Sequence, residues 1–169
     1  GAGKACRKCY LTLDGNPYIY YGEEIGMQGE KPDERIREPF KWTADGSGMD
    51  TDWEDMLSNE STTALSEQME DEGSMYHYYK KLISVRKNSE ALSKGKFEAI
   101  DAGSDDVMAY RRVSDSQTVY AVHNFTDEKA TVKLPDAKGG KVIFTGSKKG
   151  TLSGDTIALD AYASILIEK

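Results

Sequence analysis

The sequence predicts a mixed fold, in which an α/β segment is followed by an all-β antiparallel sandwich. Residues 1–92 combine helical spacing with one continuous apolar run. Over residues 93–169, short β-rich runs alternate with clusters of turn residues. The chain of 169 residues is too short for a whole (β/α)8 barrel, which takes about 250 residues. We therefore expect two unlike parts, 1–92 and 93–169.

The first part is expected to begin with a helix and a strand. A short amphipathic helix is predicted at residues 4–13, where four apolar side chains recur at helical spacing: Cys6, Cys9, Tyr10 and Leu13. Asp14–Pro17 ends this helix, because it holds a Gly suited to the cap and a Pro that cannot continue the helix. The run Tyr18–Tyr21 is continuously apolar, which is typical of a strand buried on both faces of a parallel sheet. Such a strand needs a neighbour on each side.

A long loop and a helix complete the first part. Residues 22–60 are acidic, rich in Gly and without a period, and loops of this length are usually functional or disordered. Three aromatic side chains argue against disorder: Phe40, Trp42 and Trp53. Helical spacing returns near Thr62, and a further helix is expected from an N-cap at Ser74 to about Asn88.

The second part is expected to contain about seven short strands. These are Lys96–Ile100, Val107–Val113, Thr118–Asn124, Ala130–Leu134, Lys141–Phe144, Thr156–Leu159 and Ala163–Glu168. Turn clusters such as Ser153–Asp155 separate them. Strands at this spacing are typical of an antiparallel sandwich or barrel that folds on its own.

Charge and hydropathy exclude several classes of partner. The net charge is −7, concentrated in residues 30–72, and there is no basic stripe. Phosphate backbones and anionic lipids attract basic surfaces, so we expect no nucleic acid and no membrane as partners. No apolar run approaches the roughly 20 residues of a spanning helix, and residues 1–5 lack the apolar core of a signal peptide. The localisation stays open.

The cysteines and histidines do not form a recognisable site. Cys6 and Cys9 form one C-x-x-C, but structural zinc needs four ligands, and His77 and His123 lie far from the pair. No strand precedes the pair, as a thioredoxin-type motif would require. We interpret both cysteines as small buried apolar side chains, and two unpaired thiols favour a reducing compartment. His77 lacks a triad pattern in sequence and is interpreted as a helix residue.

Two further patterns allow a functional and a structural interpretation. Several acidic residues suggest calcium, but the EF-hand order with its central Gly is absent, so a solvated acidic surface is favoured. These residues are Asp45, Asp50, Asp52, Glu54 and Asp55. Asn124–Thr126 matches a glycosylation acceptor, although an Asn at a strand end is the simpler interpretation. No metal site is predicted in this chain.

Four segments in register resemble the α-amylase family of glycoside hydrolases. Gly15–Met27 (GNPYIYYGEEIGM) resembles the segment around the family's eighth barrel strand, and Lys31–Trp42 resembles its Arg-x-Pro-(Met/Phe)-x-Trp loop. Ser74–Leu92 resembles the eighth barrel helix. Val119–Thr126 is similar to a central strand of the C-terminal β-sandwich. The resemblance covers nearly the whole chain.

The resemblance implies that residues 1–92 are the terminal segment of a TIM-type barrel, with the C-terminal β-sandwich at 93–169. The family's catalytic groups are a nucleophilic Asp, a general-acid Glu and a third Asp, all on earlier barrel strands. The third Asp belongs to an Asn-His-Asp motif, and no His-Asp dipeptide occurs here. We therefore expect no catalytic residue in this chain and no hydrolysis by it alone. The longer protein would hydrolyse α-glucosidic bonds with retention.

Glu23 and Glu24 are the tempting local pair of carboxylates. A retaining glycosidase needs two carboxyls about 5–5.5 Å apart across the sugar. In a strand, adjacent side chains point to opposite faces and cannot share a substrate. We interpret both as anchors of a loop at the barrel rim rather than as catalytic groups.

The resemblance places substrate-binding residues in the long loop. In neopullulanase-type members an Asp and an Arg four residues apart hold a glucose unit, and they match Asp33 and Arg37. An Arg offers a planar fork of donors and an Asp accepts from vicinal hydroxyls. Trp42 and Trp53 are candidates for stacking on a sugar face, with pinning of the loop as the alternative that we favour for Trp42. Glu38 departs from the common motif, which suggests a salt bridge within the loop as an alternative to sugar contact.

The resemblance also implies partners and surroundings. The expected partners are an α-glucan oligosaccharide or polysaccharide and the missing N-terminal barrel. Exposed apolar surface at Tyr18–Tyr21 predicts self-association of an isolated fragment. No cofactor is expected in this chain, and calcium is expected, if at all, only in the longer protein. Polymeric starch as substrate would place the protein outside the cell or on its surface, and oligosaccharides would place it in the cytoplasm.

Two functions of other classes remain as alternatives. A carbohydrate-binding module would hold glucan on the β-sandwich without cleaving it, and aromatic residues along an exposed sheet face would favour it. Tyr110, Tyr120 and Tyr162 are few and fit a core equally well. An interaction protein, like the amylase-resembling heavy chains of amino-acid transporters, is disfavoured by the preserved Arg37–Trp42 loop.

Overall fold

The computed structural model describes residues 9–47, 51–146 and 148–169. The helices are η1 (Glu23–Ile25), α2 (Asp33–Ile36), α3 (Leu65–Glu70), α4 (Met75–Lys87), α5 (Glu90–Lys94) and η2 (Pro135–Ala137). The strands are β1 (Lys96–Ile100), β2 (Val107–Val113), β3 (Thr118–Asn124), β4 (Ala130–Lys133), β5 (Lys141–Thr145), β6 (Gly150–Ser153), β7 (Thr156–Leu159) and β8 (Ser164–Glu168). The chain divides into two compact units, one of residues 1–17 and 82–169 and the other of residues 18–81. The boundary expected at residue 92 stays a prediction.

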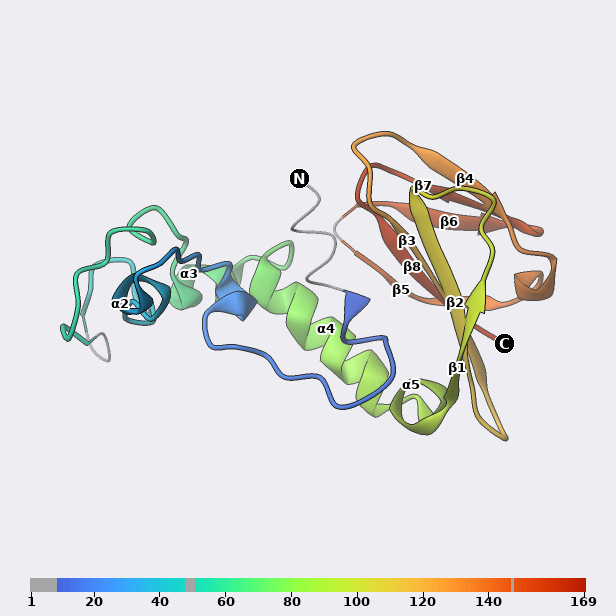
Figure 1. Ribbon diagram of the computed structural model, residues 1–169, viewed down its shortest axis with the longest axis horizontal. Coiled ribbons are helices and arrows are strands. Elements are labelled where there is room, and N and C mark those ends of the chain that lie inside the picture. The colour runs from blue at the N-terminus through green and yellow to red at the C-terminus, as the bar shows by residue number, and fades with distance from the viewer. Residues whose placement is uncertain (1–8, 48–50, 147) are drawn as a thin grey trace. The chain divides into compact units, whose positions relative to one another are not determined.

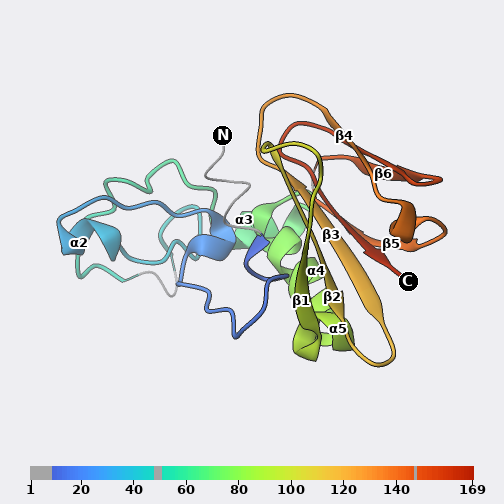
Figure 2. The same ribbon diagram turned by 45° about the vertical axis from the view of Figure 1, so that its right-hand side comes forward.

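The strands form the antiparallel sandwich that the sequence predicts (Figure 1). One sheet has the order β1-β2-β3-β8-β5 and the other has the order β4-β7-β6. Figure 2 shows β4 and β6 in a layer separate from β2 and β3. Apolar side chains of both sheets meet in one core, in which Val122, Ile165 and Ile157 are fully buried. Burial of these alternate positions is what fixes the register of each strand.

Strand β6 is absent from the sequence expectation, which stops at seven strands. The strand has four residues and a single large apolar side chain, Leu152, so its own pattern gives no β signal. It forms because Gly154, with φ +62°, allows a tight turn that pairs β6 with β7. Pairing with a strong neighbour therefore supplies what local sequence lacks.

The expectation of a strand at Tyr18–Tyr21 is wrong for this chain. These residues adopt no regular structure, and the Tyr18 side chain is 87% exposed. A strand buried on both faces exists only where neighbouring strands bond its N–H and C=O groups, and no described strand pairs with this run. The first half of the helix expected at 4–13 lies outside the described residues. After Cys9 the chain forms a turn, in which Thr12 N donates to Cys9 O at 2.8 Å.

The main helix begins where the sequence places it. Ser74 Oγ accepts a hydrogen bond from His77 N at 3.3 Å, so Ser74 is the N-cap of α4, as expected. The helical spacing expected after Thr62 corresponds to α3. Helix α5 has its own N-cap, Ser89, whose Oγ accepts a hydrogen bond from Leu92 N at 3.1 Å.

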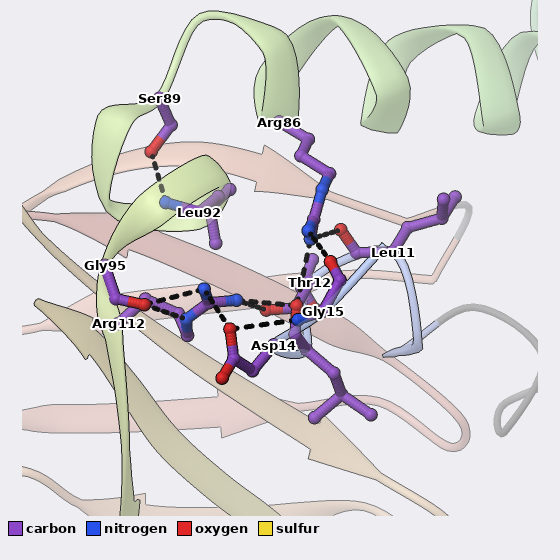
Figure 3. A network of polar contacts seen from close by, with 10 residues as sticks. Leu11, Thr12, Asp14, Gly15, Arg86, Ser89, Leu92, Gly95 and Arg112 are labelled. Atoms are coloured by element: carbon purple, nitrogen blue, oxygen red, sulfur yellow. Dashed lines mark hydrogen bonds and ion pairs between the residues drawn. The ribbon is translucent and has the colours of Figure 1, made fainter. Parts of the chain in front are cut away.

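Two arginine side chains hold the segment 11–15 against α4 and the β-sandwich (Figure 3). Arg112 of β2 is fully buried, and its Nη1 donates to Thr12 O at 3.1 Å and to Leu13 O at 2.6 Å. Its Nη2 donates to Gly95 O at 2.8 Å and pairs with Asp14 Oδ1 at 3.2 Å. A buried guanidinium is tolerated only when its donors are used in this way.

Arg86 of α4 binds the same segment from a second direction. Its Nη1 donates to Leu11 O at 2.7 Å and to Leu13 O at 2.9 Å, and its Nη2 donates to Gly15 O at 2.7 Å. Burial, followed by the nearby charge of Arg112, lowers the pKa of the Arg86 guanidinium. These charge-assisted hydrogen bonds occupy carbonyl groups of a turn that are not paired with a helix or a neighbouring strand.

A buried chain of hydrogen bonds runs beside the arginines. Thr12 Oγ1 donates to Cys9 O at 2.7 Å and therefore accepts from Tyr110 Oη. Tyr110 Oη lies 3.2 Å from His123 Nε2, and His123 Nδ1 lies 2.9 Å from Ser164 Oγ. One arrangement satisfies every group: a neutral His123 that donates from Nε2 and accepts at Nδ1. Burial lowers the pKa of His123 to about 4 and raises that of Tyr110.

Substitution of Arg112 tests the attachment of segment 11–15. Arg112→Met leaves the carbonyls of Thr12, Leu13 and Gly95 buried without donors, so the free energy of unfolding falls by about 3 kcal/mol. The matched control is Arg111→Met, the next residue of β2, whose ion pairs are partly exposed and which costs about 1 kcal/mol or less. Urea unfolding measures both variants, and equal losses would contradict the account.

The pH dependence of stability tests the neutral state of His123. The unfolded histidine binds a proton below about pH 6.5 and the folded one only near pH 4, so stability is complete above the unfolded pKa and is lost as the pH falls. The His123-dependent loss between pH 7 and pH 4 is about 3 kcal/mol. His123→Gln abolishes this component in urea unfolding, whereas the control His77→Gln retains it. An unchanged pH profile in His123→Gln would overturn the assignment.

Candidate functional site

The long loop is held together by one buried carboxylate, Glu38. Its side chain is 1% exposed. Oε1 accepts from Ser58 N at 2.8 Å, and Oε2 accepts from Asn59 N at 3.1 Å and from Asn59 Nδ2 at 2.8 Å. Burial raises the pKa of Glu38, but these hydrogen bonds outweigh it and hold the pKa below its ordinary value. Glu38 therefore stays ionised in the folded loop at neutral pH.

Asn59 extends this link to the start of the loop. Its Oδ1 accepts from Gln28 N at 2.7 Å, and its Nδ2 donates to Gln28 O at 2.7 Å. Tyr21 Oη donates to Glu38 O at 3.0 Å. Positions 21, 28, 38 and 59 are thus tied together, which explains how a segment with little regular structure stays folded. Sequence reasoning missed this, because no local pattern marks partners that lie 17 to 31 residues apart.

Asp33 and Arg37 lie together on the exposed helix α2. Arg37 Nη2 is 3.9 Å from Asp33 Oδ2, and the two side chains are 56% and 60% exposed. Arg37 Nε also donates to Asp33 O at 3.3 Å. The ion pair of Arg37 is with Asp33, whereas Glu38, for which a salt bridge was suggested, forms no ion pair among the described residues. An exposed ion pair is weak in water, so both groups remain available to a polar ligand.

The two tryptophans of the loop differ in exposure. The rings of Phe40 and Trp42 have centroids 4.5 Å apart, and Trp42 O accepts from Ser66 N at 3.0 Å. Trp42 is half-buried, which suits the pinning role, whereas Trp53 is 54% exposed. The assignment of Trp42 to substrate binding stays a prediction.

Glu23 and Glu24 lie in η1, between two glycines with positive φ, Gly22 at +88° and Gly26 at +82°. Both glycines take a left-handed conformation that other residues rarely adopt. Oε2 of Glu24 is buried and has no hydrogen-bond partner among the described residues. A buried carboxylate oxygen normally accepts a hydrogen bond. Glu24 therefore has an unused acceptor, which a donor from outside the described residues could occupy.

The acidic residues after the tryptophan motif form no cluster that the structure describes. Asp45 accepts from Ser47 N at 3.0 Å, and hydrogen bonds from Ser47 lower the pKa of Asp45. Asp50 lies outside the described residues. Over residues 9–47, 51–146 and 148–169, no three His, Cys, Asp or Glu side chains gather as metal ligands.

His77 lies closer to a serine and a carboxylate than the sequence indicates. Its Nδ1 is 3.2 Å from Ser74 Oγ, and its Nε2 is 3.8 Å from Glu72 Oε1. Nδ1 is also 2.9 Å from Asp71 O, and a carbonyl only accepts, so Nδ1 carries the proton and cannot act as a base toward Ser74. Ser74 Oγ donates to Gln68 O at 2.7 Å. The group is therefore a helix cap, in agreement with the interpretation of His77 as a helix residue.

The structure supports the simpler interpretations of Asn124 and Cys9. Asn124 is fully buried at the end of β3, where its Nδ2 donates to Glu128 O at 2.6 Å and to Asp160 O at 3.0 Å. Its amide therefore anchors a turn and is not accessible to modification. Cys9 is buried, and Cys6 lies outside the described residues. Within the described chain, no helix has the length and apolar character needed to cross a membrane.

Comparison with protein families gives two matches in order along the chain. Residues 2–95 match the family model for the alpha amylase catalytic domain. Residues 107–166 match the model for the alpha-amylase SusG C-terminal domain. The first match covers more than half of the chain.

Individual relatives agree with these models. Alpha-amylase 3 of Dictyoglomus thermophilum is 37% identical over 94% of this chain and 32% of the relative. Alpha-amylase SusG of Bacteroides thetaiotaomicron is 29% identical over 98% of this chain and 26% of the relative. The chain thus spans about a third or less of these curated relatives.

Solved structures show the same arrangement. The alpha-amylase from H. orenii has a TM-score of 0.83 and 34% identity over 98% of this chain and 35% of that one. Eubacterium rectale Amy13B has a TM-score of 0.87, and at 24% identity it supports the fold alone. The chain therefore belongs to the α-amylase family, and it comprises the end of the catalytic domain followed by the C-terminal β domain.

Proposed function

We propose that this chain is the C-terminal part of a glycoside hydrolase that acts on α-glucans with retention at the anomeric carbon. The observation that carries the proposal is the order of the two family matches, catalytic domain then SusG C-terminal domain, along one chain. The names of the relatives agree, since they include alpha-amylases and oligo-1,6-glucosidases. The relatives' substrates support starch or its oligosaccharides as the substrate class.

The loop at residues 22–60 contributes part of the substrate cleft in this proposal. Asp33 accepts hydrogen bonds from vicinal sugar hydroxyls, and Arg37 donates to them from the planar guanidinium. Their exposure on α2 supports this role, because a sugar can replace the weak ion pair between them. Trp42 lies after the buried anchor Glu38 and limits the movement of the loop.

The catalytic carboxylates come from residues upstream of this chain in the proposal. A retaining mechanism needs a nucleophile and a general acid about 5–5.5 Å apart. The exposed run Tyr18–Tyr21 and the buried oxygen of Glu24 support this, because an upstream barrel would cover the first and supply a partner for the second. The chain alone is therefore inactive and self-associates through Tyr18–Tyr21. Calcium, if bound, is held by the longer protein.

The stereochemistry of the first product tests the proposal. The longer protein incubated with maltoheptaose releases sugar that is initially the α-anomer, as read by ¹H NMR before mutarotation. The matched sample without enzyme controls for spontaneous hydrolysis. Initial β-anomer would contradict retention, and no release from any α-glucan would contradict the substrate class.

Substitution of the exposed pair tests its role in binding. In the longer protein, Asp33→Ala and Arg37→Ala each raise KM for maltooligosaccharides about tenfold with kcat little changed, because hydrogen bonds to a charged group are lost from binding. Arg35→Ala, on the same exposed helix, is the matched control and leaves KM unchanged. Steady-state kinetics separate the two constants. An unaltered KM in both variants would remove Asp33 and Arg37 from the site.

A further inference from the structure

The β-sandwich has an open groove at one edge, because its two sheets differ in width. One sheet has five strands and the other has three, and the first four residues of β1, at the edge of the larger sheet, are exposed. This leaves a cavity of about 460 Å³ between β1–β3 and the segment that joins β4 to η2. Its volume falls in the range of pockets that hold small ligands, roughly 300–1,000 Å³.

The polar side of the groove is a row of side chains that the strand register aligns. Glu98 of β1 pairs with Arg111 of β2, and Arg111 pairs with Tyr120 of β3. Arg111 Nε donates to Glu98 Oε2 at 2.7 Å, and its Nη1 lies 3.7 Å from Asp136 Oδ2. The Arg111 side chain also shares a hydrogen bond with Tyr120. The guanidinium is thus held in place while it stays partly exposed to solvent.

The other side of the groove is apolar. Ile100, Leu134 and Pro135 line it, and the ring of the buried Tyr120 also contributes. A ligand that fills the groove therefore needs both an apolar face and several hydroxyl groups. A pyranose ring has both, with C–H groups on its faces and hydroxyls around its edge.

The charge of the groove selects for a neutral ligand. The lining includes three carboxylates, Glu98, Asp101 and Asp136, and two cations, Arg111 and Lys133. The slight negative excess disfavours phosphorylated or carboxylated ligands. Fixed carboxylate and guanidinium groups suit vicinal hydroxyls, to which they offer paired acceptors and paired donors.

We propose that this groove is a second carbohydrate-binding site, which holds one or two glucose units of an α-glucan and shares no residue with the loop that carries Asp33 and Arg37. The choice of α-glucan among neutral carbohydrates rests on the proposed function. The groove residues all lie between Glu98 and Asp136, within the β-sandwich.

The test is a titration of the ¹⁵N-labelled chain with maltotetraose at millimolar concentration, followed by amide chemical shifts. Shifts are expected at residues 98–101, 111, 120 and 133–136. Asp136→Asn and Arg111→Met each raise the dissociation constant at least about tenfold. Lys129→Met removes an exposed ion pair with Asp160 elsewhere on the same sandwich and is the matched control, with unchanged binding. Arg111 and Asp136 are both partly or largely exposed, so both variants are expected to fold, and each tests the groove independently of the other.

Three outcomes would overturn the proposal. Shifts confined to residues 33–42, or no shifts at all, would remove the groove as a site. Shifts at the groove that neither variant weakens would remove the proposed contacts. Equal binding of cellotetraose would overturn the assignment to α-glucan. Hydrolysis by the longer protein is a separate readout, so a failure of the groove and a failure of the proposed function are told apart.

Discussion

The buried guanidinium of Arg112 is the constraint on which the larger unit depends. A charge removed from water costs several kcal/mol unless fixed partners replace its hydration. The partners here are carbonyl groups from Thr12, Leu13 and Gly95, and these cannot be supplied by the β-sandwich strands themselves. Segment 11–15 therefore stabilises the strand that carries Arg112, because it supplies two of these three carbonyl groups. Arg86 fastens the same segment to helix α4.

Each of the two units contains irregular backbone that is held by a charged side chain. The chain leaves the larger unit after Pro17 and returns to it at Leu82. Arg86 and Arg112 both bind segment 11–15, which ends shortly before Pro17. Glu38 holds irregular backbone in the same way inside the unit of residues 18–81. In both cases an ionised side chain with all its hydrogen-bonding groups used organises backbone that no helix or strand satisfies. Arg112 lies outside the motifs that carry the family resemblance, and Glu38 occupies a position where this chain departs from the common motif.

Sequence patterns predict the parts of the structure that local chemistry decides. Alternation of apolar residues gives β2, β3 and β8 almost to the residue, and Ser74 gives the start of α4. Patterns fail where the partner is distant. Strand β6 depends on β7, and Tyr18–Tyr21 has a strand pattern without the neighbouring strands that would bond it.

The candidate site divides in the same way. The pair Asp33 and Arg37 is indicated by the family resemblance, and the short helix α2 that brings the two side chains together was not expected in the loop. Glu38, Asn59 and the row from Glu98 to Tyr120 are not foreseeable, since strand register and loop closure bring them together.

Hydrolysis by the chain itself is the most direct test of the central claim, that its carboxylates bind and anchor but do not catalyse. Reducing-sugar release from soluble starch and maltooligosaccharides would be measured for the purified chain beside the longer protein at equal molar concentration. We expect release by the longer protein and none above the substrate blank by the chain. Release by the chain would contradict the account, and Glu23, Glu24 and Asp33 would then be the first residues to substitute.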